Sequence, residues 1–385
     1  MTAASAISRP GERNRPTIKL AALDWNLALL VALVGAISTL MLFSIAESSW
    51  SPWALNHLTR FALCFVAMII LALVDLRVWF AIAYPLYALS LALLIAVEVA
   101  GVTVMGATRW LDLGITRIQP SEIMKVGIVL ALARFYHGAS AEAARWSWKL
   151  LIPAGLIAAP VLLVAHQPDL GTSLLILFTG VAIMVLAGLS WKIIGAGVLA
   201  GAVTAPLMYF FVLHEYQRTR VDVLFNPSAD PSGAGYHITQ ALIAIGSGGL
   251  LGRGYGLGSQ AQLEYLPEKQ TDFIFATLAE EFGFLGAFGT LLVYAAIVMT
   301  ALRIASLSHS HFGRLAAAGV TATFALYILI NGAMVMGMAP VVGVPMPLLS
   351  YGGTVMMTVM AGFGLIQCVK VHRYAEITSG KGTLI

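Results

Sequence analysis

Asp272 is the residue whose type and surroundings point most directly to chemistry. It follows Thr271, which has the residue type of a helix N-cap, so we expect Asp272 in the first turn of the apolar segment after it. There the carboxylate could merely complement the helix dipole, or it could face the outer loops at the boundary of water and membrane. In the second case it could act as a general base on a lipid-linked substrate. Only one of Glu280 and Glu281 can share its face, because each helical residue turns by about 100°.

Glu122 and Lys125 lie in an otherwise apolar segment, where charged groups are costly and usually functional. Pro120 and Ser121 are typical of a helix start, with Ser121 as the cap. The spacing of Glu122 and Lys125 then places both on one helical face. Two interpretations stay open: a cap followed by an intrahelical ion pair, or a polar site that lines a cavity.

Two further turns carry polar groups next to apolar segments. Asp169, in the tight turn 167–172, could cap the following helix or be the buried partner of Lys125 or of an arginine. The broken segment 340–353, which includes Ser350, is rich in Pro and Gly. Non-helical backbone near membrane depth survives where it is buried in protein or lines a cavity.

The Gly-rich stretch 246–258 is not a nucleotide-binding loop, because it lacks the terminal Lys and Ser/Thr and a strand–loop–helix context. We expect its glycines to let the backbone approach a substrate or move with it, and Arg253 could meet a phosphate. No zinc-binding His pair and no serine-nucleophile elbow occurs in the sequence. Cys64 and Cys368 fall in apolar runs and are expected to be buried hydrophobes, without a disulfide or a metal site.

Membrane helices must position these residues. The chain has 385 residues, of which 59% are apolar and 10% charged, whereas soluble domains carry about 25% charged residues. Apolar runs of about 20 residues, the length that crosses hydrocarbon, predict an all-α polytopic membrane protein with about ten spans. The expected spans are 25–44, 58–73, 78–97, 121–136, 150–165, 172–189, 191–213, 272–302, 315–338 and 353–371.

Loop charges predict the orientation. Roughly two thirds of the Lys and Arg residues fall on the side that holds both termini, which predicts cytoplasmic tails at 1–24 and 374–385 around one membrane domain, 25–373. A long outer loop, 214–271, joins spans seven and eight and is expected to contain short helices on the membrane surface, for example around 235–245. No basic patch with interleaved aromatics suggests a nucleic-acid partner.

Several motifs, in this order and spacing, resemble the SEDS family (shape, elongation, division and sporulation proteins). They are Arg-Trp-Leu-Asp-Leu-Gly at 109–114, Gln-Pro-Ser-Glu at 119–122, Gln-Pro-Asp-Leu-Gly-Thr at 167–172, a block from 216 to Thr-Asp-Phe-Ile-Phe-Ala at 271–276, and Ser-Tyr-Gly-Gly at 350–353. The match covers nearly all of 25–373. Chain length and the long loop are most like the elongation branch of the family rather than the division branch.

The resemblance implies a peptidoglycan glycosyltransferase that polymerises lipid II into β-1,4 glycan strands on the outer face of the bacterial cytoplasmic (inner) membrane during cell elongation. It implies that Asp272 is the family's essential aspartate, with general base as its hypothetical role, and that Trp110 is the family's important tryptophan. Glu122, Lys125 and Asp169 would be polar residues of a central cavity. The sequence matches the family at all of these positions.

The resemblance also implies the ligands and the partner. The donor would be a growing glycan on undecaprenyl diphosphate, whose leaving diphosphate needs positive charge; Arg109, Arg218, Arg220 and Lys125 are the candidates. Ser350 completes the substrate-binding set. A divalent metal, magnesium or manganese, is a further candidate for this role, and a class B penicillin-binding protein, the transpeptidase, is the expected partner.

Two other functions suit a polar ten-helix bundle: a lipid II flippase, or a non-catalytic scaffold for the elongation machinery. A flippase needs a polar path into the cytoplasmic half of the bundle, whereas the polar motifs here cluster in the outer half. The enzyme is therefore favoured. Asp272→Ala separates the enzyme from a scaffold, since a scaffold should tolerate it.

Overall fold

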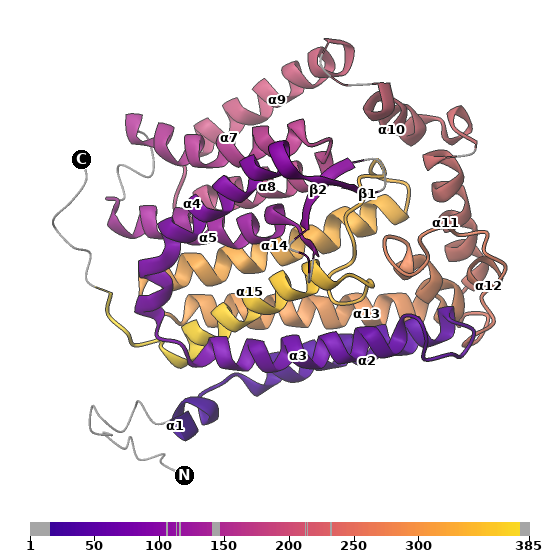
Figure 1. Ribbon diagram of the computed structural model, residues 1–385, viewed down its shortest axis with the longest axis horizontal. Coiled ribbons are helices and arrows are strands. Elements are labelled where there is room, and N and C mark those ends of the chain that lie inside the picture. Colours follow the sequence, from indigo (N-terminus) through magenta and orange to yellow (C-terminus); the bar gives the residue numbers. More distant parts are fainter. Residues whose placement is uncertain are drawn as a thin grey trace.

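The computed structural model describes residues 16–377, apart from 105–106, 113, 115–116, 141–146, 212, 214 and 232. The predicted tails therefore fall partly outside the described residues, at 1–15 and 378–385. The protein has an all-α polytopic membrane fold (Figure 1). In the described chain each predicted span corresponds to one long helix: α2 (Trp25–Ile45), α3 (Ala54–Leu73), α4 (Leu76–Ala100), α5 (Pro120–Gly138), α7 (Leu151–His166), α8 (Leu170–Leu186), α9 (Trp191–Phe211), α13 (Ile274–Ser306), α14 (His311–Val335) and α15 (Gly353–Val371).

Apolar composition and side-chain caps explain where these helices form. Asp24, Asp75 and Ser310 accept hydrogen bonds from first-turn N–H groups of α2, α4 and α14. Within the described residues, eight helices are long and apolar enough to cross a membrane, all of the above except α5 and α8. α5 carries charged side chains, and α8 has only 17 residues. Both are inner helices, because α5 packs against α4, α7, α8 and α14, and α8 against α7 and α14.

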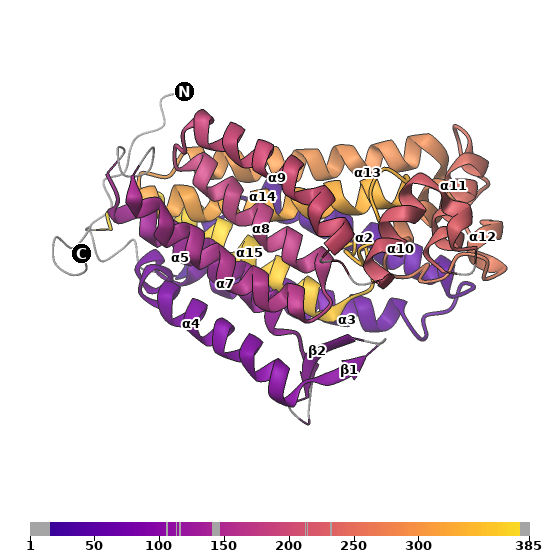
Figure 2. The same ribbon diagram turned by 90° about the horizontal axis from the view of Figure 1, so that it is seen from above.

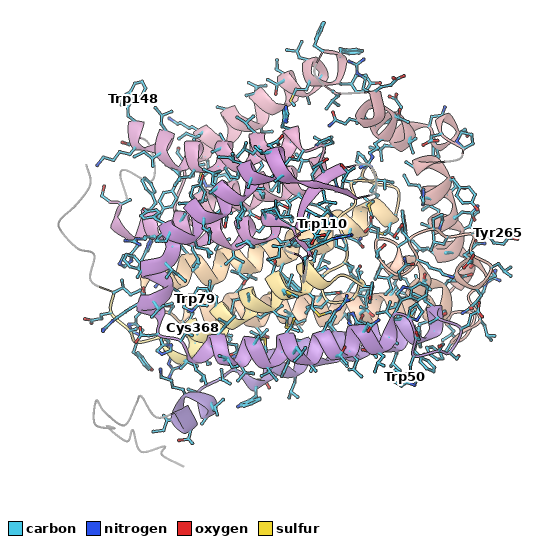
Figure 3. The ribbon with its side chains drawn as sticks, in the orientation of Figure 1. Trp50, Trp79, Trp110, Trp148, Tyr265 and Cys368 are labelled. Carbon is cyan, nitrogen blue, oxygen red and sulfur yellow. The ribbon has the colours of Figure 1, made fainter. Side chains whose placement is uncertain are left out.

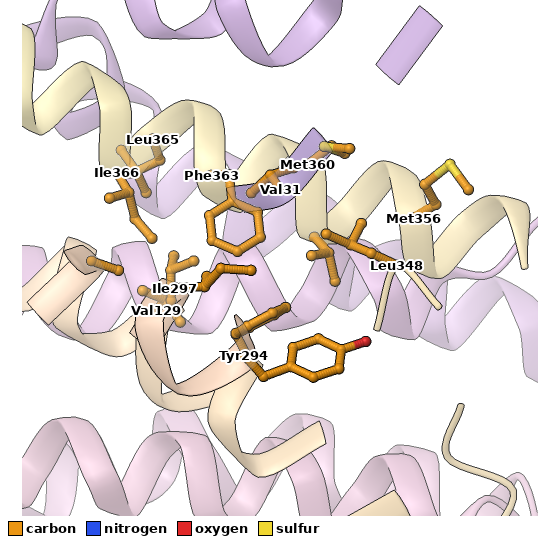
Figure 4. Close-up of a cluster of buried hydrophobic side chains, with 14 of the residues drawn as sticks. Val31, Val129, Tyr294, Ile297, Leu348, Met356, Met360, Phe363, Leu365 and Ile366 are labelled. Carbon is orange, nitrogen blue, oxygen red and sulfur yellow. The ribbon is translucent and has the colours of Figure 1, made fainter. Parts of the chain in front are cut away.

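The bundle core lies where α13, α14 and α15 meet. The rings of Tyr294 and Phe324 have centroids 5.7 Å apart, and those of Phe324 and Phe363 are 5.0 Å apart. Figure 4 shows Tyr294 and Phe363 in this buried cluster. α3 packs on α15, and α4 packs on α5. α9 has no buried residue, and its outward Leu, Val and Phe side chains are those expected of a lipid-facing helix.

The two ends of the described chain lie at the same end of the bundle. α1 (Pro16–Ala21) and the last turn of α15 lie together in Figure 1. Lys370 Nζ is 3.4 Å from a carboxylate oxygen of Asp24, and Gln367 Nε2 donates a 2.8 Å hydrogen bond to the Asp24 carbonyl. The short elements of the long loop gather at the opposite end: α10 (Glu215–Phe225), η3 (Pro227–Ala229), α11 (Ala234–Gly248) and α12 (Ser259–Gln262). α11 confirms the helix predicted around 235–245 and runs across this end of the bundle (Figure 1).

A small antiparallel sheet between α4 and α5 is the element that the sequence analysis missed. It contains β1 (Val102–Val104), β2 (Ala107–Asp112) and β3 (Arg117–Ile118), in that order. Val102 pairs with Trp110, and Leu111 pairs with Ile118. The run Val-Thr-Val was the available signal, because β-branched residues favour strands.

The Gly-rich stretch packs its backbone against α13. α13 is interrupted at Gly283, whose φ of 64° is in the left-handed region, and a Cβ there would overlap the backbone nitrogen of Gly252. The interruption frees the N–H of Phe284, which donates a 2.9 Å hydrogen bond to the Gly249 carbonyl. Gly248 and Gly252 therefore allow the close approach to α13, because a Cβ atom at either would overlap α13 backbone. Arg253, a predicted phosphate contact, instead donates to Ser259 and to a neighbouring carbonyl.

Glu280 and Glu281 hold this loop in place. Both are buried. Glu280 accepts a 3.1 Å hydrogen bond from the backbone N–H of Gln260, and Glu281 accepts one of 2.6 Å from the Ser44 hydroxyl on α2. The two carboxylates thus tie the loop and α2 to α13 and lie outside the cavity described next.

Candidate active site

A cavity of about 850 Å³ opens among α3, the small sheet, α5, α8, α14 and the start of α15. Its size matches pockets that bury a substrate. Polar side chains from distant parts of the sequence converge on it. The described lining includes Arg60, Arg109, Trp110, Arg117, Gln119, Glu122, Lys125, Asp169, Thr172, Glu268, Thr271, Asp272, Tyr327, Tyr351 and Thr354.

Asp272 lies in the turn just before α13, not in the first helical turn. α13 begins at Ile274 with Phe273 in the N-cap position, so the prediction that Thr271 caps this helix is wrong. The Thr271 hydroxyl instead donates a 2.8 Å hydrogen bond to the Glu268 carboxylate. Because Asp272 precedes the helix, its carboxylate faces the cavity without capping any N–H group.

The backbone around Asp272 is fixed by side chains from two other segments. Asn331 Nδ2 on α14 donates to the Asp272 carbonyl at 2.9 Å and to the Val344 carbonyl at 2.8 Å. The Ser350 hydroxyl donates to the Thr271 carbonyl at 2.6 Å. Ser350, a predicted substrate-binding residue, is therefore placed to support the turn and is not among the described lining residues.

The pKa of Asp272 is raised to about 6, chiefly by burial and next by the nearby Glu268 carboxylate, whereas Arg220 acts in the opposite direction. A carboxylate normally titrates near pH 4, where it is a weak base. With a pKa near 6 it is still mostly ionised at neutral pH and has a greater affinity for a proton. The site thus offers one carboxylate suited to general base catalysis.

Glu122, Lys125 and Tyr327 form a buried polar triangle that lines the same cavity as Asp272. Lys125 Nζ is 2.5 Å from Glu122 Oε1 and also donates to the Tyr327 hydroxyl, which lies 3.2 Å from Glu122 Oε2. Glu122 and Lys125 are 4% and 2% exposed. The ion pair is intrahelical and also lines the cavity, so parts of both interpretations hold, whereas the cap that belonged to the first is wrong. Ser121 is not the cap, because α5 begins at Pro120 with Gln119 in the cap position.

The cavity ends at this triangle. Lys125 also borders a void of only about 30 Å³, whose other lining includes Val126, Val129, Phe324 and Phe363. This second space is almost entirely apolar. Among the described lining residues, the polar region therefore extends inward from the loop end as far as Lys125, beyond which the second space is largely apolar.

Asp169 fills both roles considered for it. It caps α8 by accepting a 3.2 Å hydrogen bond from the Thr172 N–H, and it is the buried partner of Arg109 at 3.7 Å. Arg109 also donates to the carbonyls of Gln167 and Pro168. Arg109 is thus engaged in holding the α7–α8 turn against β2.

Trp110 follows Arg109 on β2 and lines the cavity. Figure 3 shows Trp110 toward the middle of the molecule, away from Trp148 at one end and Tyr265 at the other.

The two predicted arginines of the long loop differ in placement. Arg220 on α10 is close enough to Asp272 to lower the pKa of that carboxyl. Arg218 donates to the Phe210 carbonyl at 2.8 Å and is not among the described lining residues.

Several residues of the described lining were not predicted as site residues, among them Arg60, Glu268, Tyr327 and Tyr351. Arg60 had a usable signal, as a single charge within an apolar span. Glu268 and Tyr351 lie inside motifs that were recognised for other residues. Tyr327 gave no signal, because an aromatic residue in an apolar helix usually belongs to the core.

No group of three or more His, Cys, Asp or Glu side chains among the described residues could hold a metal ion. Magnesium, however, often binds through one or two carboxylates together with substrate phosphates. Asp272 and Glu268, which share the cavity, have the donor chemistry for such a site.

Comparisons with known proteins identify the family of this chain. The family model described as a cell cycle protein, covering FtsW, RodA and SpoVE, matches residues 19–375. The chain belongs to the SEDS family. Among its SEDS relatives is the peptidoglycan glycosyltransferase MrdB of Escherichia coli, which is 46% identical over 82% of this chain and 84% of its own length. Stage V sporulation protein E of Bacillus subtilis is 32% identical over 94% of this chain and all of its own length.

Solved SEDS structures share the fold. A chain from a peptidoglycan synthase complex that coordinates polymerization and crosslinking is 32% identical, has a TM-score of 0.78, and matches 92% of this chain and 99% of its own. The rod shape determining protein RodA of Thermus thermophilus is 29% identical, with a TM-score of 0.68 and coverage of 92% and 98%. The relatives MrdB and RodA confirm the predicted likeness to the elongation branch of the family.

Proposed function

We propose that this protein is a peptidoglycan glycosyltransferase that polymerises lipid II at the outer face of the bacterial inner membrane. The observation that carries the proposal is Asp272, a cavity-facing carboxylate with its pKa raised to about 6. The relatives named peptidoglycan glycosyltransferases support the reaction class. Their relationship covers most of the chain.

The reaction joins two lipid-linked sugars. The acceptor is lipid II, whose 4-hydroxyl oxygen attacks the anomeric carbon of the growing glycan. As that bond forms, Asp272 takes the hydroxyl proton, and the bond from the anomeric carbon to the diphosphate oxygen breaks with its electron pair going to oxygen. Undecaprenyl diphosphate leaves, and the α-linked donor gives a β-linked product by inversion. Positioned general bases contribute about 10²–10⁴-fold to such steps.

The shape of the cavity favours an enzyme over a flippase. A flippase must carry a diphosphate and sugars through the whole bundle, whereas the polar lining here stops at Lys125 above apolar side chains. The isoprenoid tails of the two substrates can remain in the bilayer. α3 packs on α15 and α4 on α5, and α3 and α4 diverge from one end of the bundle (Figure 2), so the tails would reach the cavity between these two pairs.

We extend the proposal to the orientation of the protein in the membrane, its partner and a metal ion. The cavity end faces outward, and the end that holds α1 and the last turn of α15 is cytoplasmic, as the loop charges predict. A class B penicillin-binding protein is the proposed partner, supported by the similarity to a chain of a peptidoglycan synthase complex. A magnesium or manganese ion held by Glu268 would supply charge that stabilises the leaving diphosphate and would leave the Asp272 carboxylate free to accept the proton.

The test is polymerisation of purified lipid II in detergent by the native chain and by Asp272→Asn, each with and without the penicillin-binding partner. We expect polymer from the native chain and a rate about 10²–10⁴-fold lower for the variant. Equal rates would show that Asp272 is not the base. If the native chain makes no polymer even with its partner, the transport and scaffold functions regain priority.

A further inference from the structure

Four basic side chains line the described part of the cavity, and three of them already have acidic partners. Arg109 pairs with Asp169 at 3.7 Å, Arg117 with Asp112 at 3.4 Å, and Lys125 with Glu122 at 2.5 Å. The fourth is Arg60, which forms no ion pair with any carboxylate among the described residues. These pairs leave Arg109, Arg117 and Lys125 with little net charge to offer an anion.

Arg60 is held over an aromatic ring at the cavity wall. Its guanidinium carbon lies 5.4 Å from the centroid of the Tyr351 ring. A Cβ atom at Gly353 would lie 3.5 Å from Arg60 Nη1, so the glycine leaves room beside the guanidinium. Arg60 itself is exposed on α3. A planar guanidinium that rests on a ring keeps its N–H groups free at the edge, where they can bind phosphate oxygens in pairs.

Hydrogen bonds link the segment that supports Arg60 to the turn that carries Asp272. The Tyr351 N–H donates a 2.8 Å hydrogen bond to the Gln270 carbonyl, and the adjacent Ser350 hydroxyl bonds the Thr271 carbonyl. The ring beneath Arg60 and the turn that carries Asp272 are therefore one hydrogen-bonded unit. Such a unit can hold a cationic group and a general base in a fixed relative position, with the donor sugar between them.

We infer that Arg60, oriented by Tyr351, binds the diphosphate of the undecaprenyl-linked substrate. This inference rests on the proposed function and names the residue that receives its leaving group. As the bond from the anomeric carbon to the diphosphate oxygen breaks, negative charge grows on that oxygen. The Arg60 N–H groups then form stronger hydrogen bonds to the diphosphate.

The test measures equilibrium binding of undecaprenyl diphosphate and of undecaprenol to the full chain in detergent. We expect Arg60→Gln to weaken diphosphate binding by roughly 10- to 100-fold, the usual effect of losing a hydrogen bond to a charged group. Binding of the uncharged undecaprenol should not change. Arg60→Lys should retain part of the affinity, because it keeps the charge but not the paired donors.

Arg117→Gln is the matched control, since it removes an arginine at the same cavity that is paired with Asp112. Because the Asp112 carboxylate already offsets the charge of Arg117, we expect the affinity of this variant for the diphosphate to stay within about twofold of native. Tyr351→Leu removes the ring and should weaken binding roughly two- to fivefold. It provides a second test should Arg60→Gln not fold.

Three results would overturn the inference: native affinity in Arg60→Gln, an equal loss in Arg117→Gln, or an equal loss of undecaprenol binding. The binding assay is independent of polymerisation. A chain that binds the diphosphate through Arg60 but makes no glycan would refute the proposed function alone. A chain that polymerises while Arg60→Gln binds normally would refute the role of Arg60 alone.

Discussion

The pH dependence of polymerisation gives the sharpest test of Asp272 as the base. With its pKa raised to about 6, the ionised fraction of Asp272 falls from about 0.9 at pH 7 to about 0.1 at pH 5. The carboxylate must be ionised to accept a proton, so activity is present above pH 6 and is lost as the pH falls through that value. An ordinary aspartate would stay above about 0.9 ionised over the same range. We therefore expect initial rates from saturating lipid II to drop about eight- to tenfold between pH 7 and pH 5.

A neighbouring charge makes the test specific to this carboxyl. Glu268 raises the pKa of Asp272, second to burial as a cause. Glu268→Gln should therefore move the acidic limb of the pH–rate profile to lower pH. The pKa of Asp272 should stay above that of an ordinary aspartate, because burial of its carboxyl remains. Glu264→Gln is the control, because that side chain is 85% exposed on the same loop and is not among the described lining residues. An acidic limb that stays in place in Glu268→Gln, or moves upward, would refute the assignment.

Three further predictions concern stability and local structure; the first two are measured by thermal unfolding in detergent and the third by limited proteolysis. Asp272→Asn should raise the melting temperature at pH 8, because ionising a carboxyl whose pKa is raised costs folding free energy above about pH 4, and this gain should shrink at pH 4. Tyr327→Phe removes a hydroxyl bonded to a buried ion pair and should cost about 1–3 kcal/mol, seen as a lower melting temperature. Gly283→Ala should prevent the loop from docking, detected as new protease cleavage within 246–262, whereas Gly289→Ala, with no atoms within 4 Å of its Cβ position, should behave as native.

The sequence predicted the bundle well because span length and hydropathy are local properties. Each of the predicted spans has its helix, including the short and charged α5. Asp272 and Lys125 were also recognisable, since a charge at the edge of or within an apolar run has few structural explanations. The start of α13 was misplaced by two residues because the Thr271 hydroxyl bonds Glu268 instead of an N–H of the next turn. Sequence spacing does not reveal such a choice between two local acceptors.

Other parts of the site depend on contacts between distant segments. Tyr327 joins the site only because α14 lies against α5, which places its hydroxyl beside an ion pair some two hundred positions earlier in the chain. The conformation of Gly283 depends on the loop that packs against it. Neither the hydrophobic pattern of α13 nor that of α14 contains this information.

The distribution of charge in the cavity bears on why one site could both hold and release a lipid diphosphate. Paired cations such as Lys125 and Arg109 shape the walls without adding much net positive charge, because Glu122 and Asp169 neutralise them. A cavity with every cation free would bind the diphosphate product tightly and slow its release. Tighter binding would also not speed the chemical step if it applied equally to the substrate and the transition state. If Arg60 is the one arginine of the described lining without an ion pair, the attraction is concentrated where charge develops as the glycosidic bond breaks. The ion pairs around the cavity would then favour turnover as much as stability.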